Sequence, residues 1–80
     1  MTTFVQDLAT ILSDRFGVPT EEFAEDRPMT EFGIDSLVAV ELALFLQKSL
    51  GIELAPGDIS AEQTPLEIKA LVRSKGADVQ

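Results

Sequence analysis

Apolar residues recur at helical spacing in three segments of this 80-residue chain, and no stretch shows the alternation typical of a β-strand. The segments span residues 3–16, 36–50 and 64–74. Gly17 and Gly51 follow the first two directly, where glycine commonly ends a helix. The pattern predicts an all-α fold with three principal helices.

The connections between these segments differ in length and composition. The first, residues 18–35, is long for a compact domain, which indicates that it packs or functions. The second contains the run Pro56-Gly57-Asp58-Ile59, which leaves room for only a short helical turn. We therefore predict a four-helix bundle in a single domain over residues 1–80, with one short third helix and a long loop between helices one and two. The apolar anchors expected for that loop are Phe23, Met29, Phe32 and Ile34.

Polar residues mark the start of each predicted helix. Thr2 or Thr3 can cap the first helix, and Thr64 opens the last one with a capping box. Asp35 is a suitable N-cap for the second helix. With Asp35 as the cap, Ser36 occupies the first helical position and its hydroxyl should be exposed.

The charge of the chain restricts its partners and its location. Fourteen acidic residues against six basic ones give a net charge of −8, which disfavours nucleic acid and anionic membranes and makes basic protein surfaces the better candidates. The alternative is that this charge only keeps a small protein soluble. No apolar run approaches the roughly 18 residues of a membrane span. The first residues lack the features of a secretory signal, and the absence of cysteine suits a reducing compartment. We expect a cytoplasmic protein.

The chain also lacks several residue types that enzymes commonly use. It contains no histidine and no cysteine, so the usual general base, thiolate nucleophile and soft metal ligands are missing. We therefore expect no catalytic residue and no metal site.

The second predicted helix has apolar residues on opposite sides. One side is an ordinary core face of Ala39, Leu42, Ala43, Leu46 and Leu50. The other is a stripe of Leu37, Val40 and Leu44, bordered by Glu41 and Lys48. Either the long loop covers this stripe or the stripe binds a partner, and a mixture would put Val40 near the core and Leu37 outside.

Ser36 stands at the predicted start of this helix, where free backbone amides and the positive end of the helix dipole favour a phosphate group. Without a histidine, nothing in the chain resembles the base that activates a hydrolase serine. Ser36 is then better suited to be the substrate of another enzyme, and the alternative is a plain capping serine.

The sequence Gly33-Ile34-Asp35-Ser36-Leu37 at the head of an amphipathic helix resembles the attachment site of acyl carrier proteins. An upstream helix and long loop, the following Val40-Glu41-Leu42, Gly51 at the helix end and the capped last helix extend the resemblance over about residues 4 to 73.

The resemblance implies a role for each matched residue. Ser36 would receive 4′-phosphopantetheine from coenzyme A, installed by a phosphopantetheinyl transferase, and Asp35 would help to hold the transferase's magnesium ion. The partner-recognition surface would comprise Leu37, Val40, Glu41 and Leu44. The chain would be a non-catalytic monomer that delivers acyl thioesters to a ketosynthase, an acyltransferase and other biosynthetic enzymes.

Details of the motif distinguish subtypes of carrier. The second predicted helix continues with Gln47 and Lys48 where many fatty-acid carriers have acidic residues. Electrostatic docking to basic enzymes would therefore depend more on Glu41, Glu53, Asp58 and Glu62. The motif is more similar to that of polyketide-synthase carriers than to that of housekeeping fatty-acid carriers. Peptidyl carriers usually have histidine where this chain has Asp35, which disfavours that subtype.

We therefore expect a carrier of polyketide or specialised fatty-acid biosynthesis. The alternatives are a housekeeping fatty-acid carrier, a nonribosomal-peptide carrier and an unmodified helical interaction module. A small hydrolase that uses Ser36 itself is disfavoured by the missing base. The initial methionine and short tails favour a free-standing protein over an excised module.

Overall fold

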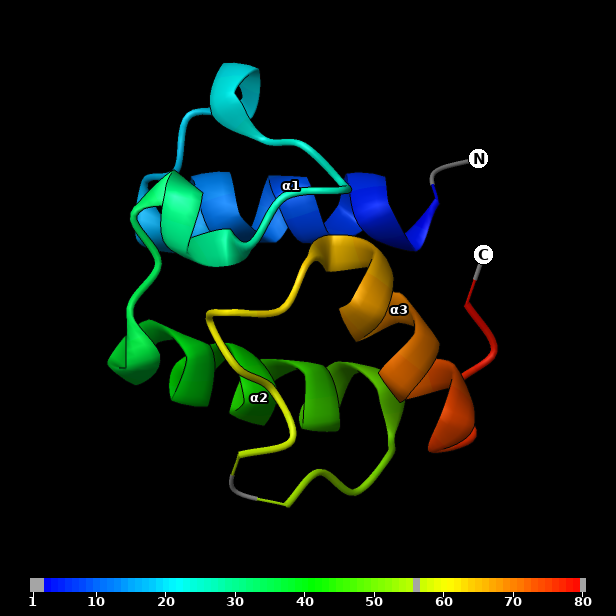
Figure 1. Ribbon diagram of the computed structural model, residues 1–80. Helices are drawn as coiled ribbons and strands as arrows, with labels where there is room; N and C mark the ends of the chain where they lie inside the picture. Colours follow the sequence, from blue (N-terminus) through cyan, green and yellow to red (C-terminus); the bar gives the residue numbers. More distant parts are fainter. Residues whose placement is uncertain (1–2, 56, 80) are drawn as a thin grey trace.

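Three α-helices dominate the computed structural model, which describes residues 3–55 and 57–79 (Figure 1). No β-strand occurs in these ranges, so the predicted all-α class is confirmed. None of the helices there has the length and apolar character of a membrane crossing. In chain order the elements are α1 (Phe4–Phe16), the 3₁₀ turns η1 (Thr20–Glu22) and η2 (Met29–Phe32), α2 (Ser36–Leu50) and α3 (Pro65–Ser74).

The predicted boundaries of α1 and α3 hold because local side-chain bonds fix them. Thr3 Oγ1 accepts a hydrogen bond from Gln6 N at 3.2 Å, while Gln6 Oε1 accepts from Thr3 N at 3.1 Å. Thr64 and Glu67 form the same reciprocal capping box at the start of α3. Gly17 ends α1 with φ of 72°, a left-handed conformation that favours glycine. Thr2, the other candidate cap, lies outside the described residues.

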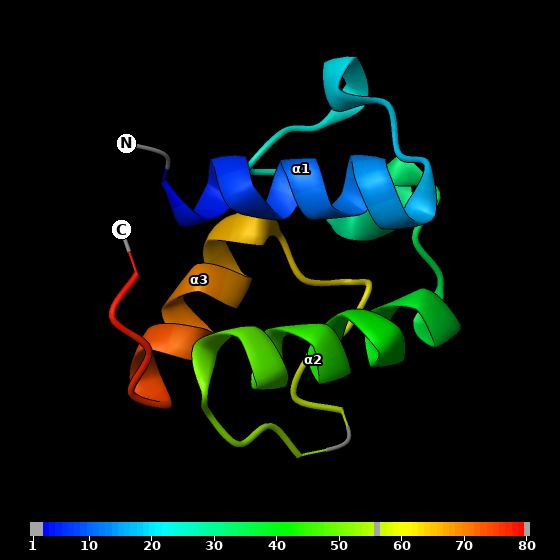
Figure 2. The same ribbon diagram turned by 180° about the vertical axis from the view of Figure 1, so that it is seen from behind.

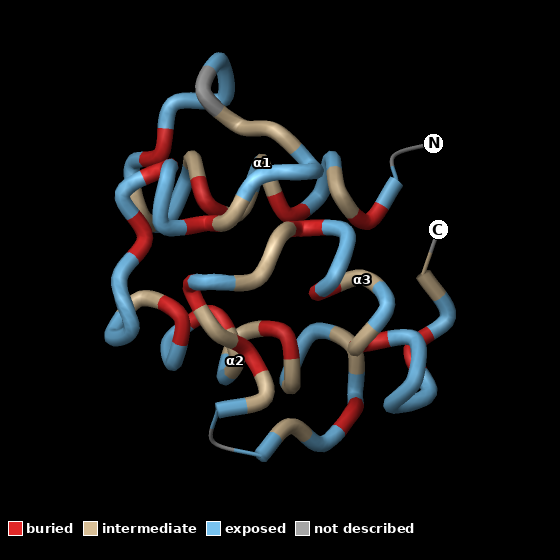
Figure 3. Tube along the Cα trace, in the orientation of Figure 1, coloured by how far each residue is buried: buried red, intermediate tan, exposed pale blue. Residues whose placement is uncertain are grey.

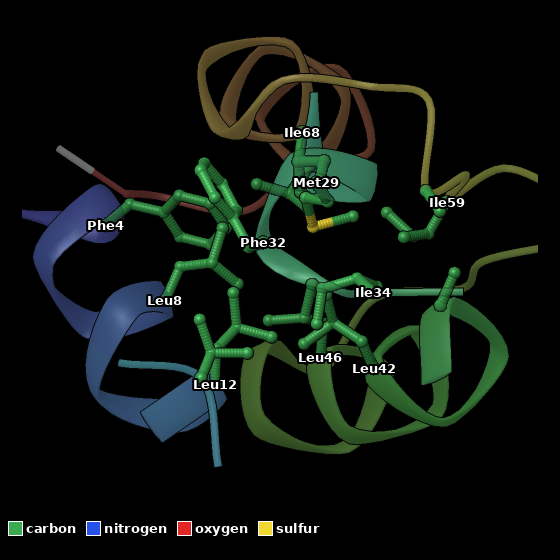
Figure 4. Close-up of a cluster of buried hydrophobic side chains, with 14 of the residues drawn as sticks. Phe4, Leu8, Leu12, Met29, Phe32, Ile34, Leu42, Leu46, Ile59 and Ile68 are labelled. Carbon is green, nitrogen blue, oxygen red and sulfur yellow. The ribbon is translucent and has the colours of Figure 1, made fainter. Parts of the chain in front are cut away.

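The helices enclose one apolar core. α1 and α2 lie on opposite sides of it, and α3 crosses between them near the two chain ends (Figures 1 and 2). Buried residues follow the inward faces of all three helices and continue into the connections (Figure 3). The close-up in Figure 4 shows labelled side chains from each of these parts: Phe4, Leu8, Leu12, Met29, Phe32, Ile34, Leu42, Leu46, Ile59 and Ile68.

The long loop between α1 and α2 packs against the later connection, residues 52–64. Met29 N donates to the carbonyl of Gln63 at 3.0 Å, and Thr30 N donates to the carbonyl of Ala61 at 2.9 Å. Three of the four predicted anchors (Met29, Phe32 and Ile34) are buried, and the fourth, Phe23, is half-buried with its ring 5.4 Å from that of Phe32. The loop is therefore fixed beside α3, and it leaves the outer face of α2 open.

The predicted short third helix is absent from the described part of the second connection, which contains turns and bends instead. Asp58 Oδ2 accepts a hydrogen bond from Ala55 N at 2.8 Å, and Gln63 Nε2 donates to the Asp58 carbonyl at 3.0 Å. These side-chain bonds replace the backbone bonds that a helix would need, and Gly57 has φ of 89°, outside the helical range. The short third helix, and with it the four-helix bundle, is therefore not confirmed, and Pro56 lies outside the described residues.

Candidate functional site

Ser36 is exposed and is the first residue of α2, as predicted. Asp35 caps this helix, since its Oδ1 accepts a hydrogen bond from Val38 N at 2.9 Å and its carbonyl accepts from Ala39 N at 3.0 Å. The amides of Ser36 and Leu37 find no acceptor in the described chain. Two free amides and the positive end of a 15-residue helix therefore surround the serine.

The turn before α2 gives Ser36 its exposure. Gly33 has φ of 84°, a value at which an L side chain would be strained, and it ends η2 by donating to the Thr30 carbonyl at 3.2 Å. Ile34 is 3% exposed and inserts into the core, and its amide bonds to the Met29 carbonyl at 3.2 Å. With Ile34 anchored inward, the next residues, Asp35 and Ser36, lie on the surface.

The surroundings of Ser36 suit a phosphorylated group. A phosphate ester on the serine would lie at a helix start, where backbone amides and the helix dipole stabilise negative charge. The chain holds no histidine, and Asp35, the nearest carboxylate in the sequence, uses one oxygen to cap α2. Oδ2 of Asp35 makes no hydrogen bond among the described residues.

The apolar stripe on α2 is open to solvent. Leu37 is 67% exposed, Val40 52% and Leu44 56%, whereas the core face of the same helix is buried at Ala39, Leu42 and Leu46 and half-buried at Ala43 and Leu50. The alternative in which the long loop covers the stripe was wrong, because that loop bonds to residues 61–63 instead. Val40, considered for a place near the core, belongs to the exposed surface.

One flank of the stripe is an apolar hollow of about 110 Å³ between α2 and the second connection, lined by Val40, Leu44, Leu54 and Ile59 among others. Gln47 borders this hollow, and its Oε1 accepts a hydrogen bond from Leu54 N at 2.8 Å. From the sequence, Gln47 was interpreted only as a position where many fatty-acid carriers have an acidic residue. Its structural role depends on a residue seven positions later, so helical spacing alone could not indicate it.

The other flank faces α1 and carries cations. A hollow of about 380 Å³ is lined by Arg15, Glu41, Leu44, Phe45, Lys48 and Ser49. The guanidinium carbon of Arg15 lies 4.3 Å from the centroid of the Phe45 ring, a cation–π contact. Sequence reasoning noted Lys48 and missed Arg15, which only the fold brings to α2.

Not all acids expected to support docking are free. Asp58 forms an ion pair with Lys75, with Nζ 3.2 Å from Oδ2. The hydrogen bond from the Ala55 amide and the nearby Lys75 lower the pKa of Asp58. Its charge is therefore compensated within the chain, whereas Glu41, Glu53 and Glu62 are exposed. Glu41 is the one of these that lies on α2 beside the stripe.

Fold and site together define a small helical domain with an exposed serine at a helix start and an exposed apolar stripe beside it. Comparison with known proteins identifies the class. The model of the family described as a phosphopantetheine attachment site matches residues 6–72, and the chain belongs to this family. The family is defined by covalent attachment of 4′-phosphopantetheine.

Curated relatives are much longer proteins. A non-reducing polyketide synthase from Acremonium egyptiacum is 31% identical over 72 residues, which cover 90% of this chain and 3% of the synthase. A highly reducing polyketide synthase from Aspergillus niger is 31% identical over 70 residues, covering 88% of this chain and 3% of the synthase. Phthioceranic/hydroxyphthioceranic acid synthase from Mycobacterium tuberculosis is 50% identical over 36 residues, covering 45% of this chain and 2% of that protein. Among solved structures, none gives a significant match.

Proposed function

We propose that this chain is a non-catalytic acyl carrier in which Ser36 bears the 4′-phosphopantetheine arm. The observation that carries the proposal is the position of Ser36: it is exposed, it begins a 15-residue helix, and two free amides lie beside it. When attached, the arm supplies a terminal thiol on which acyl groups are held as thioesters. A carrier of this kind needs no histidine or cysteine of its own.

Loading transfers the arm from coenzyme A to the serine. Ser36 Oγ forms a bond to the phosphorus that bears pantetheine, the pyrophosphate bond to that phosphorus breaks, and adenosine 3′,5′-bisphosphate leaves. The hydroxyl proton passes to a base of the phosphopantetheinyl transferase or to water. Asp35 would help to bind the transferase's Mg²⁺ through Oδ2, since Oδ1 is engaged with Val38 N.

The exposed surface of α2 would bind the enzymes that use the carrier. Leu37, Val40 and Leu44 offer an apolar centre, and Glu41 offers a charge at its edge. An apolar anchor with charged surroundings suits transient docking of a transferase, an acyltransferase or a ketosynthase.

The chain would serve polyketide or specialised fatty-acid biosynthesis. Support comes from the names of the relatives, two polyketide synthases and a phthioceranic acid synthase, although each match covers 3% or less of the relative. The housekeeping fatty-acid carrier is the second candidate, and it differs by further acids on α2, where this chain has Gln47 and Lys48.

Loading with a broad-specificity phosphopantetheinyl transferase and coenzyme A tests the attachment residue. We expect intact-mass spectrometry to show a gain of one phosphopantetheine group on the wild type and none on Ser36→Ala. Ser49→Ala, a change at another exposed serine of α2, is the control and should gain the full mass. Circular dichroism should show the same helical content for all three. An unmodified wild type, or a modified Ser36→Ala, would overturn the proposal.

A further inference from the structure

Two cations gather beside α2 in a chain of net charge −8. Arg15, from the end of α1, lies over the ring of Phe45, and Lys48 is the only basic residue of α2. Neither cation forms an ion pair within the described residues, in contrast to Arg27 and Lys75. Both line the hollow of about 380 Å³ on the α1 flank of the stripe, where two positive charges face the single negative charge of Glu41 beside an aromatic wall.

The hollow lies within reach of Ser36. Phe45 lies nine positions after Ser36 and Lys48 lies twelve after it, which corresponds to about 14 and 18 Å along the helix axis. At about 100° per residue, both also lie around the helix from Ser36, on the other side of the stripe. A phosphopantetheine arm has roughly 13 bonds from phosphorus to sulfur and extends about 16 Å. An acyl group adds a few bonds beyond the sulfur, so the far end of an extended, loaded arm can cross the stripe and reach the two cations.

We propose that this hollow holds the free carboxylate of a dicarboxylic acyl group, of the malonyl type, carried on the Ser36 arm. The inference rests on the proposed function, because the arm delivers the group. Arg15 and Lys48 pair with the carboxylate, and the Phe45 ring holds the guanidinium in place beneath it. A neutral acyl group has no charge to place there. The carrier thus distinguishes its cargo by charge at the far end of the stripe.

Tethering makes a weak site effective. A group on a short flexible arm experiences an effective concentration on the order of millimolar at its site, so millimolar affinity gives about half occupancy. Glu41 also lines the hollow and opposes the carboxylate, which keeps the association reversible. A reversible association is useful for a carrier, because the group must leave for the next enzyme.

The test follows the pKa of the cargo carboxylate. Three proteins are loaded with a malonyl arm: wild type, the double variant Arg15→Gln/Lys48→Gln, and the control double variant Lys69→Gln/Arg73→Gln. The donor is malonyl-coenzyme A with a ¹³C-labelled free carboxylate, and a broad-specificity phosphopantetheinyl transferase performs the loading. The control removes two positive charges from α3 instead. Titration by ¹³C NMR at low salt should give a carboxylate pKa about half a unit higher in the first double variant than in wild type. The control should match wild type, and Glu41→Gln should lower the pKa.

Each outcome bears on one proposal. Equal carboxylate pKa values in wild type and Arg15→Gln/Lys48→Gln, with every protein fully loaded, would overturn the cargo site and leave the carrier function intact. A pKa raised as much in the α3 control would also overturn it, because the effect would then be that of net charge. Failure of the wild type to load would count against the proposed function itself. Amide spectra of the variants before loading check that each is folded.

Discussion

Asp35 has one structural role and one proposed functional role, and a pair of substitutions separates them. Its Oδ1 caps the helix by accepting from Val38 N, and its charge would assist the Mg²⁺-dependent transferase under the proposed function. Asparagine is as good an N-cap as aspartate, but it is uncharged. Asp35→Asn should therefore keep the stability of the wild type in urea denaturation and slow loading by the transferase.

Asp35→Ala removes both contributions. We expect it to lower the free energy of unfolding by about 1 kcal/mol, the usual cost of a lost N-cap, and to slow loading as well. Asp26→Ala, at an exposed turn position with no side-chain hydrogen bond in the described structure, should change neither quantity. If Asp35→Asn loaded as fast as wild type, Asp35 would be a cap only.

At the scale of elements, the second connection depends on an ion pair that responds to pH. The Ala55 amide and Lys75 lower the pKa of Asp58 below the ordinary aspartate value of about 3.9. The charged carboxylate therefore stabilises the fold above pH 4, and this contribution is lost as the pH falls through the lowered pKa. Asp58→Asn should have a lower melting temperature than wild type at pH 7, and the difference should shrink toward pH 3. A difference that stays constant across this range would show that the charge of Asp58 is not the cause.

The same connection shows why sequence predicted some elements and not others. The caps Thr3, Asp35 and Thr64 act within three residues, so the sequence alone located the helices correctly. The exposed stripe followed from helical spacing in α2. The fold of residues 52–64 depends on bonds from Gln47 and to Lys75, which lie on other elements, so no local pattern could predict it. Arg15 reached the site in the same unpredictable way, from another helix.

Over the whole molecule, charge is distributed unevenly around the exposed stripe of α2. The acidic charges of Asp35 and Glu41 lie toward the Ser36 end of α2, and the cations Arg15 and Lys48 lie toward the other end. Asp58, paired with Lys75, adds little to the field that a partner meets. Under the proposed function, a basic partner would therefore be attracted mainly to the half of α2 that carries Ser36. This arrangement favours one direction of docking along the helix, since the reversed direction would bring like charges together.

Glu41→Lys tests whether this field guides the transferase to Ser36. The substitution reverses one charge beside the exposed stripe, so we expect about threefold slower loading at low salt, through slower association. The difference should fall toward unity at 0.5 M salt, because screening removes long-range attraction between exposed charges. Glu21→Lys is the matched control: it changes the net charge equally, but it lies on η1, on the far side of α1 from α2 (Figures 1 and 2). Initial rates of coenzyme A consumption at both salt concentrations measure the effect. If the two variants slowed loading equally, overall charge would guide the encounter, and if neither did, apolar contact with Leu37, Val40 and Leu44 would be the dominant attraction.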